Sequence, residues 1–202
     1  MPNVIPTKGN LMSSRRTLTL ANLGFDLMDR KRSILIHEMM ALIDAASALQ
    51  GNIDEAFTRA YAALLDANVS LGLIGGLAQA VELDDSVQIR FRSVMGVEIP
   101  IVTADDARPE VAPYGLAFTN AALDRAYVEF LKLKMFTIRL AEVETGVYRL
   151  AQAIKKTQKR ANALQNIIIP NLTGDVKFIT DALEEKEREE FARLKVIRSV
   201  NS

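Results

Sequence analysis

The chain has 202 residues, of which 49% are apolar, and its 25 basic side chains balance its 25 acidic ones. This composition supports a folded core, and a zero net charge means that any attraction to nucleic acid or to an acidic membrane must come from local patches. The sequence contains no cysteine and a single histidine, His37. It therefore excludes disulfides, thiol catalysis, cysteine metal sites and multi-histidine metal sites.

Neither a signal peptide nor a membrane-spanning helix is predicted. The opening stretch MPNVIPTKGNLMSSRR has no apolar core of signal-peptide length. No window approaches the roughly 20 mostly apolar residues that a transmembrane helix needs. We expect a cytoplasmic protein without direct membrane insertion, which reaches a membrane only through a partner.

Residues 11–80 are predicted to form one long coiled-coil helix. A heptad frame from Leu11 to Leu77 places apolar side chains at seventeen of its twenty a and d positions, and moving the frame by one residue leaves only nine. Such a stripe is typical of a coiled coil. Arg32 occupies an a position, where a charge is disfavoured unless it sets the register or reaches a partner. Gly51-Asn52 is the predicted weak point of the helix.

Residues 87–102 change to a period of two. Val87, Ile89 and Phe91 alternate with polar residues, and a second alternating run follows a turn that contains Gly96. This pattern predicts a β-hairpin, and Pro100 makes its second strand an edge strand. The stretch that follows, TADDARPEVAPYG, is typical of a loop.

A second long helix is predicted over residues 118–198, with a capping residue at Thr119-Asn120. Its apolar stripe is less strict and slips near Pro170, where a proline would cost roughly 3 kcal/mol in a helix interior. We interpret Pro170 as a built bend that absorbs the slip. The stripe is predicted to run through Leu123, Ala126, Phe130, Leu133, Leu140, Val147, Ala151, Ile154, Ala161 and Ile168, then through Leu172, Val176, Ile179 and Leu183.

These elements together predict a mainly α fold. Two helices of similar length joined by a compact insert bury their stripes most simply on each other, as an antiparallel pair. We therefore expect a long antiparallel two-helix coiled coil with a small β-hairpin insert, in a single elongated domain over residues 1–202.

The sequence offers little catalytic chemistry. The acidic pairs Asp84-Asp85 and Asp105-Asp106 flank the hairpin, where solvated turn residues are expected. The glycines of GLIGG at 72–76 lack the spacing of a phosphate-binding loop and follow a helix, so a helix terminus is the better interpretation. His37 has no partner residue for a metal site or a catalytic pair.

Three basic clusters form bands along the predicted helices: Arg15-Arg16, Arg30-Lys31-Arg32, and Lys155-Lys156 with Lys159-Arg160. Such clusters are either solvated faces or contacts for an acidic partner. Nucleic acid is disfavoured because the net charge is zero and no aromatic platform accompanies the bands. The acidic run at 181–194 is typical of a solvated helix face with i,i+4 ion pairs.

Four motifs in order resemble the D subunit of V-type ATPases and archaeal-type ATP synthases, the central rotor shaft. They are PTKGNL at 6–11, YGLAFTNAALDRA at 114–126, KRANAL at 159–164 with Ile169-Pro170, and EEKEREEFARLK at 184–195. The insert at 51–113 matches poorly. The resemblance and the basic bands give the predicted partner-contact residues Arg15, Arg16, Lys31, Arg32, Lys155, Lys156, Lys159, Arg160, Asn162 and Pro170.

The resemblance implies a shaft that couples ATP hydrolysis or synthesis to rotation of a membrane ring and ion transport. Its expected partners are the hexamer of catalytic and non-catalytic subunits, the small companion F subunit of the central stalk and the funnel-shaped adaptor on the membrane ring. The chain itself would be non-catalytic and without a cofactor. A freestanding coiled-coil scaffold is the alternative, and an enzyme is the third class.

Overall fold

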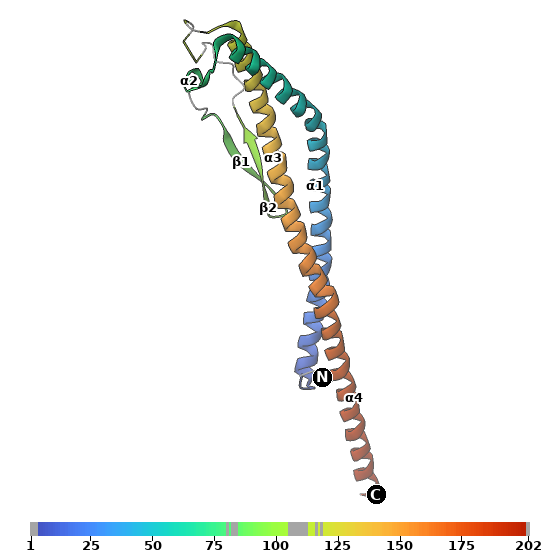
Figure 1. Ribbon diagram of the computed structural model, residues 1–202. Coiled ribbons are helices and arrows are strands. Elements are labelled where there is room, and N and C mark those ends of the chain that lie inside the picture. Colours follow the sequence, from blue (N-terminus) through green and yellow to red (C-terminus); the bar gives the residue numbers. More distant parts are fainter. Residues whose placement is uncertain are drawn as a thin grey trace. The chain divides into compact units, whose positions relative to one another are not determined.

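The computed structural model describes residues 4–79, 81, 85–104, 113–115, 117 and 119–200 (Figure 1). It confirms the predicted fold class: one long helical stretch precedes a β-hairpin in the chain, and a second follows it. The chain divides into unit 1, Met1–Ser33 with Ile154–Ser202, and unit 2, Ile34–Ala153. In chain order the elements are α1 (Lys8–Leu71), α2 (Gly75–Ala78), β1 (Gln88–Val94), β2 (Val97–Thr103), α3 (Ala121–Ala163), the π-helix η2 (Leu164–Ile168) and α4 (Ile169–Val200).

The predicted heptad frame of α1 is confirmed by the burial of its side chains. Every a and d position from Leu11 to Leu77 is buried or half-buried except Ser70, which is exposed. The helix continues through Gly51-Asn52 without interruption. It ends at Leu71, earlier than predicted, where Gly72 takes the left-handed φ of 79° and donates its N–H to Asn68 O at 2.9 Å.

The start of α3 shows the predicted cap. Asn120 Oδ1 accepts hydrogen bonds from the backbone N–H groups of Ala122 and Leu123, both at 3.1 Å, which satisfies two of the free donors of the first turn. In that turn the hydroxyl of Tyr114 donates to Asp124 Oδ1 at 2.6 Å. Burial of the ring, and secondarily this hydrogen bond, raise the pKa of the Tyr114 hydroxyl above its usual value.

In unit 2 the core lies between alanines of α1 and larger side chains of α3. Ala56 and Ala60 pack with Leu133, flanked by Phe130 and Phe136. The small alanine side chains let the helix axes come close, so that little water remains at the seam.

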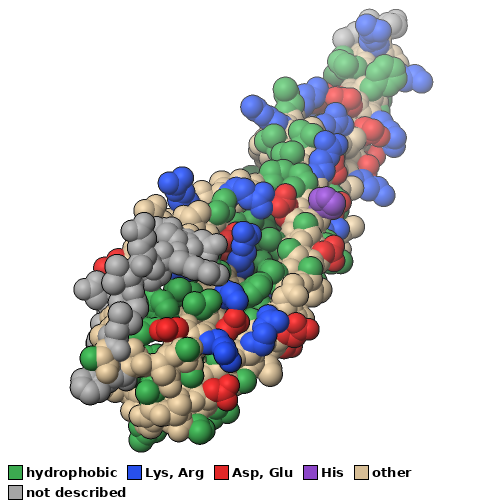
Figure 2. Space-filling model, turned by 90° about the horizontal axis from the view of Figure 1, so that it is seen from above, with side chains coloured by type: hydrophobic (Ala, Val, Ile, Leu, Met, Phe, Trp, Pro, Cys, Tyr) green, Lys and Arg blue, Asp and Glu red, His purple; other side chains and the backbone are tan. Residues whose placement is uncertain are grey.

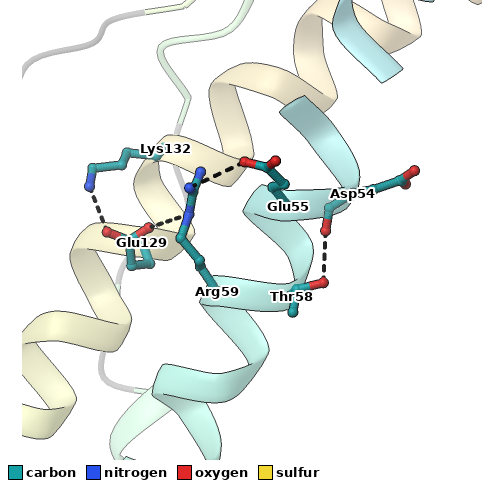
Figure 3. A network of polar contacts seen from close by, with 6 residues as sticks. All are labelled: Asp54, Glu55, Thr58, Arg59, Glu129 and Lys132. Atoms are coloured by element: carbon teal, nitrogen blue, oxygen red, sulfur yellow. Dashed lines mark hydrogen bonds and ion pairs between the residues drawn. The ribbon is translucent and has the colours of Figure 1, made fainter. Parts of the chain in front are cut away.

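A polar network borders this seam (Figure 3). Arg59 of α1 extends toward Glu129 of α3, with Nε 3.9 Å from Oε2, and also pairs with Glu55 one turn earlier at 3.6 Å. Glu129 is held in place by Lys132 on its own helix. Because Arg59 and Lys132 are at least half exposed, these pairs add little to stability, and of the three only Arg59–Glu129 joins the two helices.

The β-hairpin turns through Met95 and Gly96, whose φ angles are 51° and 76°. Positive φ at both central residues matches the two-residue turn that follows the twist of antiparallel strands. The register pairs Val94 with Val97 and continues to Gln88 with Thr103. The hairpin and the edge position of Pro100 are therefore as predicted.

The inner strand β2 packs on α3 at a glycine. A Cβ on Gly146 would lie 3.0 Å from Leu42 Cδ1 and 3.2 Å from Ile99 Cγ2, so the absence of a side chain lets α1, α3 and β2 meet. Ile99 is only 3% exposed. The α3 side chains around this point face two neighbours, α1 and the hairpin.

In unit 1 the register slip lies at η2. Ala161 is buried and Leu164 half-buried, and the next half-buried positions are Ile169 and Leu172, so one step across η2 spans five residues. A π turn adds one residue to a helical turn and carries the stripe back to the seam. The prediction that Ile168 lies in the seam is therefore wrong, since its side chain is 41% exposed.

The π turn also explains how the helix accommodates Pro170. Ile169 donates its N–H to Leu164 O, five residues earlier. Pro170 follows directly as the second residue of α4, where it has no N–H to contribute. The interruption observed here is a π turn, and whether the helix also bends at Pro170 stays a prediction.

A second error concerns the stripe of α3 in unit 2. The predicted seam residue Ala151 is exposed, whereas Leu150 is fully buried and Val143 is 8% exposed. The stripe shifts because this part of α3 packs against both α1 and the hairpin. A frame based on one partner helix misses the second contact.

Candidate partner-contact surface

All ten predicted partner-contact residues lie in unit 1, and the structure brings most of them to one level. Arg32 Nη1 of α1 donates to Gln158 Oε1 of α3, which places Lys31 and Arg32 beside Lys155–Arg160. Arg16 lies sixteen residues before Arg32 on the same helix, which corresponds to about 24 Å along its axis. The Arg15-Arg16 band is therefore separate from the other two.

The cations of these bands are largely free of intrachain partners. Six of the eight cations among the predicted contact residues are exposed. No carboxylate in the described part of the chain forms an ion pair with these six. Nor does the sequence contain an aspartate or glutamate between Glu144 and Asp175. Such a set repels itself unless counter-ions or an acidic partner surround it. The six are Arg15, Arg16, Lys155, Lys156, Lys159 and Arg160.

Arg32 and Asn162 have a different environment. Arg32 is half-buried, pairs with Asp29 and donates to Gln158 across the helix pair. Gln158 in turn donates from Nε2 to Asn162 Oδ1 at 2.8 Å. We call these four residues the register network, because a polar contact at a coiled-coil seam holds one alignment of the helices. The sequence left two explanations for a charge at this a position: it sets the register or reaches a partner. The contacts of Arg32 with Asp29 and Gln158 support the first.

Sequence reasoning missed an exposed set of apolar side chains, which we call the apolar band. Gly24 and Leu164 lie at the same level, since a Cβ on Gly24 would be 3.8 Å from Leu164 Cδ1. Five large apolar residues near that level are at least 41% exposed. Figure 2 shows hydrophobic and charged side chains interspersed on the face that it displays. The band consists of Leu20, Leu23 and Leu27 of α1 with Ile167 and Ile168 of η2.

A sequence signal for the apolar band exists. Leu20, Leu23 and Leu27 recur at i, i+3 and i+7, which is the spacing of a second stripe on the same helix. On η2, the π turn moves Ile167 and Ile168 away from the seam. Exposed large apolar residues at one level of a helix pair are candidates for a protein–protein contact.

Comparison with known proteins identifies the family. Residues 10–199 match the family model that describes the D subunit of ATP synthase. The chain belongs to the ATP synthase D-subunit family. The resemblance inferred from the four sequence motifs is thereby confirmed, and the match includes the insert at 51–113.

Relatives within the ATP synthase D-subunit family align over nearly their whole length. The D subunit of the V-type ATP synthase of Thermotoga neapolitana is 43% identical, with 97% of each chain covered. The D subunit of the A-type ATP synthase of Thermococcus kodakarensis is 35% identical, over 98% of this chain and 94% of the relative. The A-type D subunit of Pyrococcus abyssi is 34% identical, over 99% and 97%.

Two further observations concern the described residues of this chain. In the described residues no helix is long and apolar enough to span a membrane. Over the same residues, no group of three or more histidine and acidic side chains is placed to hold a metal ion.

Proposed function

We propose that this chain is the central rotor shaft of a V-type rotary ATPase or ATP synthase. In this role it couples ATP hydrolysis or synthesis in a catalytic hexamer to rotation of a membrane ring and to ion transport. The observation that carries the proposal is membership of the ATP synthase D-subunit family over residues 10–199. The pairing of two long helices within each unit supports it.

The two-helix construction suits the transmission of torque. A single helix twists easily, whereas two helices joined by side-chain contacts resist relative sliding. In unit 1 the register network supplies directional contacts between the helices. In unit 2 the alanine seam packs the helices closely, and the Arg59–Glu129 pair adds a polar contact between them. A shaft with different faces then favours a different conformation of each surrounding subunit, through differential contact free energy.

The surfaces of unit 1 are proposed to meet the hexamer. The apolar band would contact an apolar inner wall, while the unpaired cations on either side would face acidic or polar groups. The companion F subunit and the funnel-shaped adaptor would then contact unit 2. The shaft is proposed to have no catalytic role or cofactor of its own, so the isolated chain should neither bind nor hydrolyse nucleotide.

A reversible cross-link tests the shaft role. Because the chain has no cysteine, Lys156→Cys supplies a single thiol on an exposed position. The partner cysteine is placed on the inner wall of the hexamer in the reconstituted complex. Oxidation should stop ATP hydrolysis, and reduction should restore it. The control is Lys156→Cys in a complex without the second cysteine. Full activity in the cross-linked complex would overturn the proposal.

Neutralising the cations tests the contact surface itself. Replacing Lys155, Lys156, Lys159 and Arg160 by glutamine should weaken assembly with the hexamer about tenfold at low salt, with a smaller effect at high salt. The matched control replaces four exposed cations of unit 2, Arg90, Arg125, Lys132 and Arg139. Equal effects of the two sets of substitutions, or no dependence of assembly on salt, would mean that the bands are solvated faces and not contact surfaces.

Co-purification separates the shaft from the alternative of a freestanding scaffold. A shaft should be recovered from native membranes in a fixed ratio to the ATPase subunits. A scaffold would be recovered without them.

A further inference from the structure

The two edges of the β-hairpin differ in how their backbone groups are used. A two-residue turn makes Val94 and Val97 a hydrogen-bonded pair, so hydrogen-bonded and non-hydrogen-bonded pairs alternate from there. The N–H and C=O groups of the non-hydrogen-bonded residues point away from the hairpin. They belong to Ile89, Phe91 and Ser93 on β1, and to Glu98, Pro100 and Val102 on β2.

The outer edge of β2 is closed. Glu98 O accepts a hydrogen bond from Arg149 Nη1 of α3 at 3.1 Å, and Val102 N donates to Glu142 Oε2 of the same helix at 3.3 Å. Between them Pro100 has no N–H to offer. Because two outward backbone groups are bonded to α3 and Pro100 lacks an N–H, few backbone groups on this edge are free to pair with another strand.

The outer edge of β1 has no partner among the residues that the structure describes. Every residue from Gln88 to Ser93 is exposed, and Figure 1 draws β1 on the side of β2 away from α3. Within the described part of the chain, no hydrogen bond engages the outward groups of Ile89, Phe91 or Ser93. Ile89 is 61% exposed and Phe91 56%. An unpaired edge with exposed apolar side chains is a template for strand addition.

The charges on β1 select the kind of strand that fits. Arg90 is exposed and has no ion-pair partner in the described residues, whereas Arg92 pairs with Glu38 at 3.2 Å. Ile89 and Phe91 point to one face of the hairpin, and Arg90 points to the other. A matching strand would place apolar residues beside Ile89 and Phe91, and an acidic residue beside Arg90.

A second copy of this chain does not meet that requirement. Antiparallel pairing of two β1 strands centred on Phe91 would set Arg90 against Arg92. A shift by one residue in either direction would set Arg90 or Arg92 against its own copy. Like charges directly opposite each other destabilise a sheet.

We infer that the free edge of β1 binds an extended strand of another polypeptide in which apolar and acidic residues alternate. Backbone hydrogen bonds to Ile89, Phe91 and Ser93 provide the affinity, and Arg90 selects the acidic face. This inference rests on the hairpin alone and does not depend on the proposed function.

The test uses the full-length chain and a probe peptide of about ten residues in which valine and glutamate alternate. Binding is followed by fluorescence anisotropy of the labelled peptide, and hydrogen exchange of each backbone amide by NMR. The peptide should slow exchange at Ile89, Phe91 and Ser93 at least about tenfold. The helix amides should not change. A peptide with lysine in place of glutamate should bind at least about tenfold more weakly.

A matched pair of variants separates backbone pairing from side-chain contact. Ile89→Pro removes an outward N–H without removing a bond between β1 and β2, and should weaken peptide binding about tenfold. Ile89→Ala shortens the same side chain but keeps the N–H, and should weaken binding by less than about threefold. Protection of the Val97 amide shows whether the hairpin remains folded in each variant.

Several results would overturn the inference. They are no detectable binding of the acidic peptide, equal binding of the lysine peptide, protection of amides other than the three on the open edge, and equal effects of the proline and alanine variants in folded protein. Self-association of the chain through β1 would also overturn it, because it would assign the edge to a second copy.

Discussion

The two units pair helices from the same two long stretches, but with different chemistry at the seam. In unit 2, five successive heptad positions of α1 are buried, and four of them are alanines: Ile53, Ala56, Ala60, Ala63 and Ala67. In unit 1, Ala21 is the buried position among those of α1, in the part of the chain that the structure describes. There the seam includes the register network, the buried Thr157 and a π turn.

This difference shows two ways to fix one helix against another. Small apolar residues allow close approach and exclude water, so unit 2 is held by packing. In unit 1, longer side chains leave part of the seam accessible, and directional hydrogen bonds select the alignment. Substitutions that remove packing should therefore act most strongly in unit 2, and loss of polar contacts should be measurable in unit 1.

Leu150→Ala should have the largest effect. Leu150 is fully buried in unit 2, and its truncation should lower the free energy of unfolding by about 2–5 kcal/mol because it leaves a cavity. Denaturant unfolding measures the change. Leu65→Ala, at a position 65% exposed, is the matched control and should cost less than about 1 kcal/mol. Equal losses would mean that packing does not dominate unit 2.

Ala60→Leu should come next, with a loss of about 1–3 kcal/mol. Ala60 is fully buried against Leu133, so a larger side chain must push the helices apart. The same change at the exposed Ala62 keeps the helix propensity similar and removes the crowding. Thermal melting of both variants checks the prediction, and a stable Ala60→Leu chain would show that the alanine seam is not closely packed.

The contact between Arg32 and Gln158 should contribute about 1 kcal/mol. A double-mutant cycle with Arg32→Ala and Gln158→Ala isolates this coupling from the other effects of each change. The pair Lys8 and Glu187, whose side chains are 80% and 63% exposed, provides a control that should show less coupling. A coupling of zero at Arg32 would remove the register network from the account of unit 1.

Pro170→Ala should have the smallest effect on stability, below about 1 kcal/mol, because the preceding π turn already accommodates the missing N–H. Gln152→Pro, at an exposed site in the uninterrupted part of α3, should cost about 3 kcal/mol. Melting of the two chains compares them. We further expect Pro170→Ala to assemble normally but to couple ATP hydrolysis to ion transport less well in the reconstituted complex. A large loss of stability would contradict both parts.

The fold was predictable from the sequence where a pattern spans only a few residues and the element packs against a single neighbour. The α1 stripe, the Asn120 cap and the hairpin each depend on spacing within a few residues. The stripe of α3 was predicted incorrectly at Ala151 because Gly146 admits the hairpin as a second neighbour, and no spacing in α3 announces that contact. The slip near Pro170 was visible, but the proline drew the interpretation toward a bend, whereas the five-residue step lies just before it.

The candidate site was predictable only in part. Clusters of cations are visible in the sequence; in the structure six of the eight predicted contact cations are exposed, whereas Lys31 and Arg32 are half-buried. The alignment of the helices determines that Arg32 faces Gln158, and this alignment depends on the sum of many contacts along both helices. Ile168 was missed as a surface residue because it fits the expected stripe until the π turn is known.

The π turn at Leu164–Ile168 also bears on how the length of this protein changes during evolution. A deletion of one residue in an ordinary long helix rotates everything beyond it by about 100° and breaks its contacts. Here the extra residue of the turn is already present, so losing one residue would restore a regular helix and keep the seams on both sides in contact. The segment 164–168 is thus a place where the chain can lose a single residue without realigning the helices.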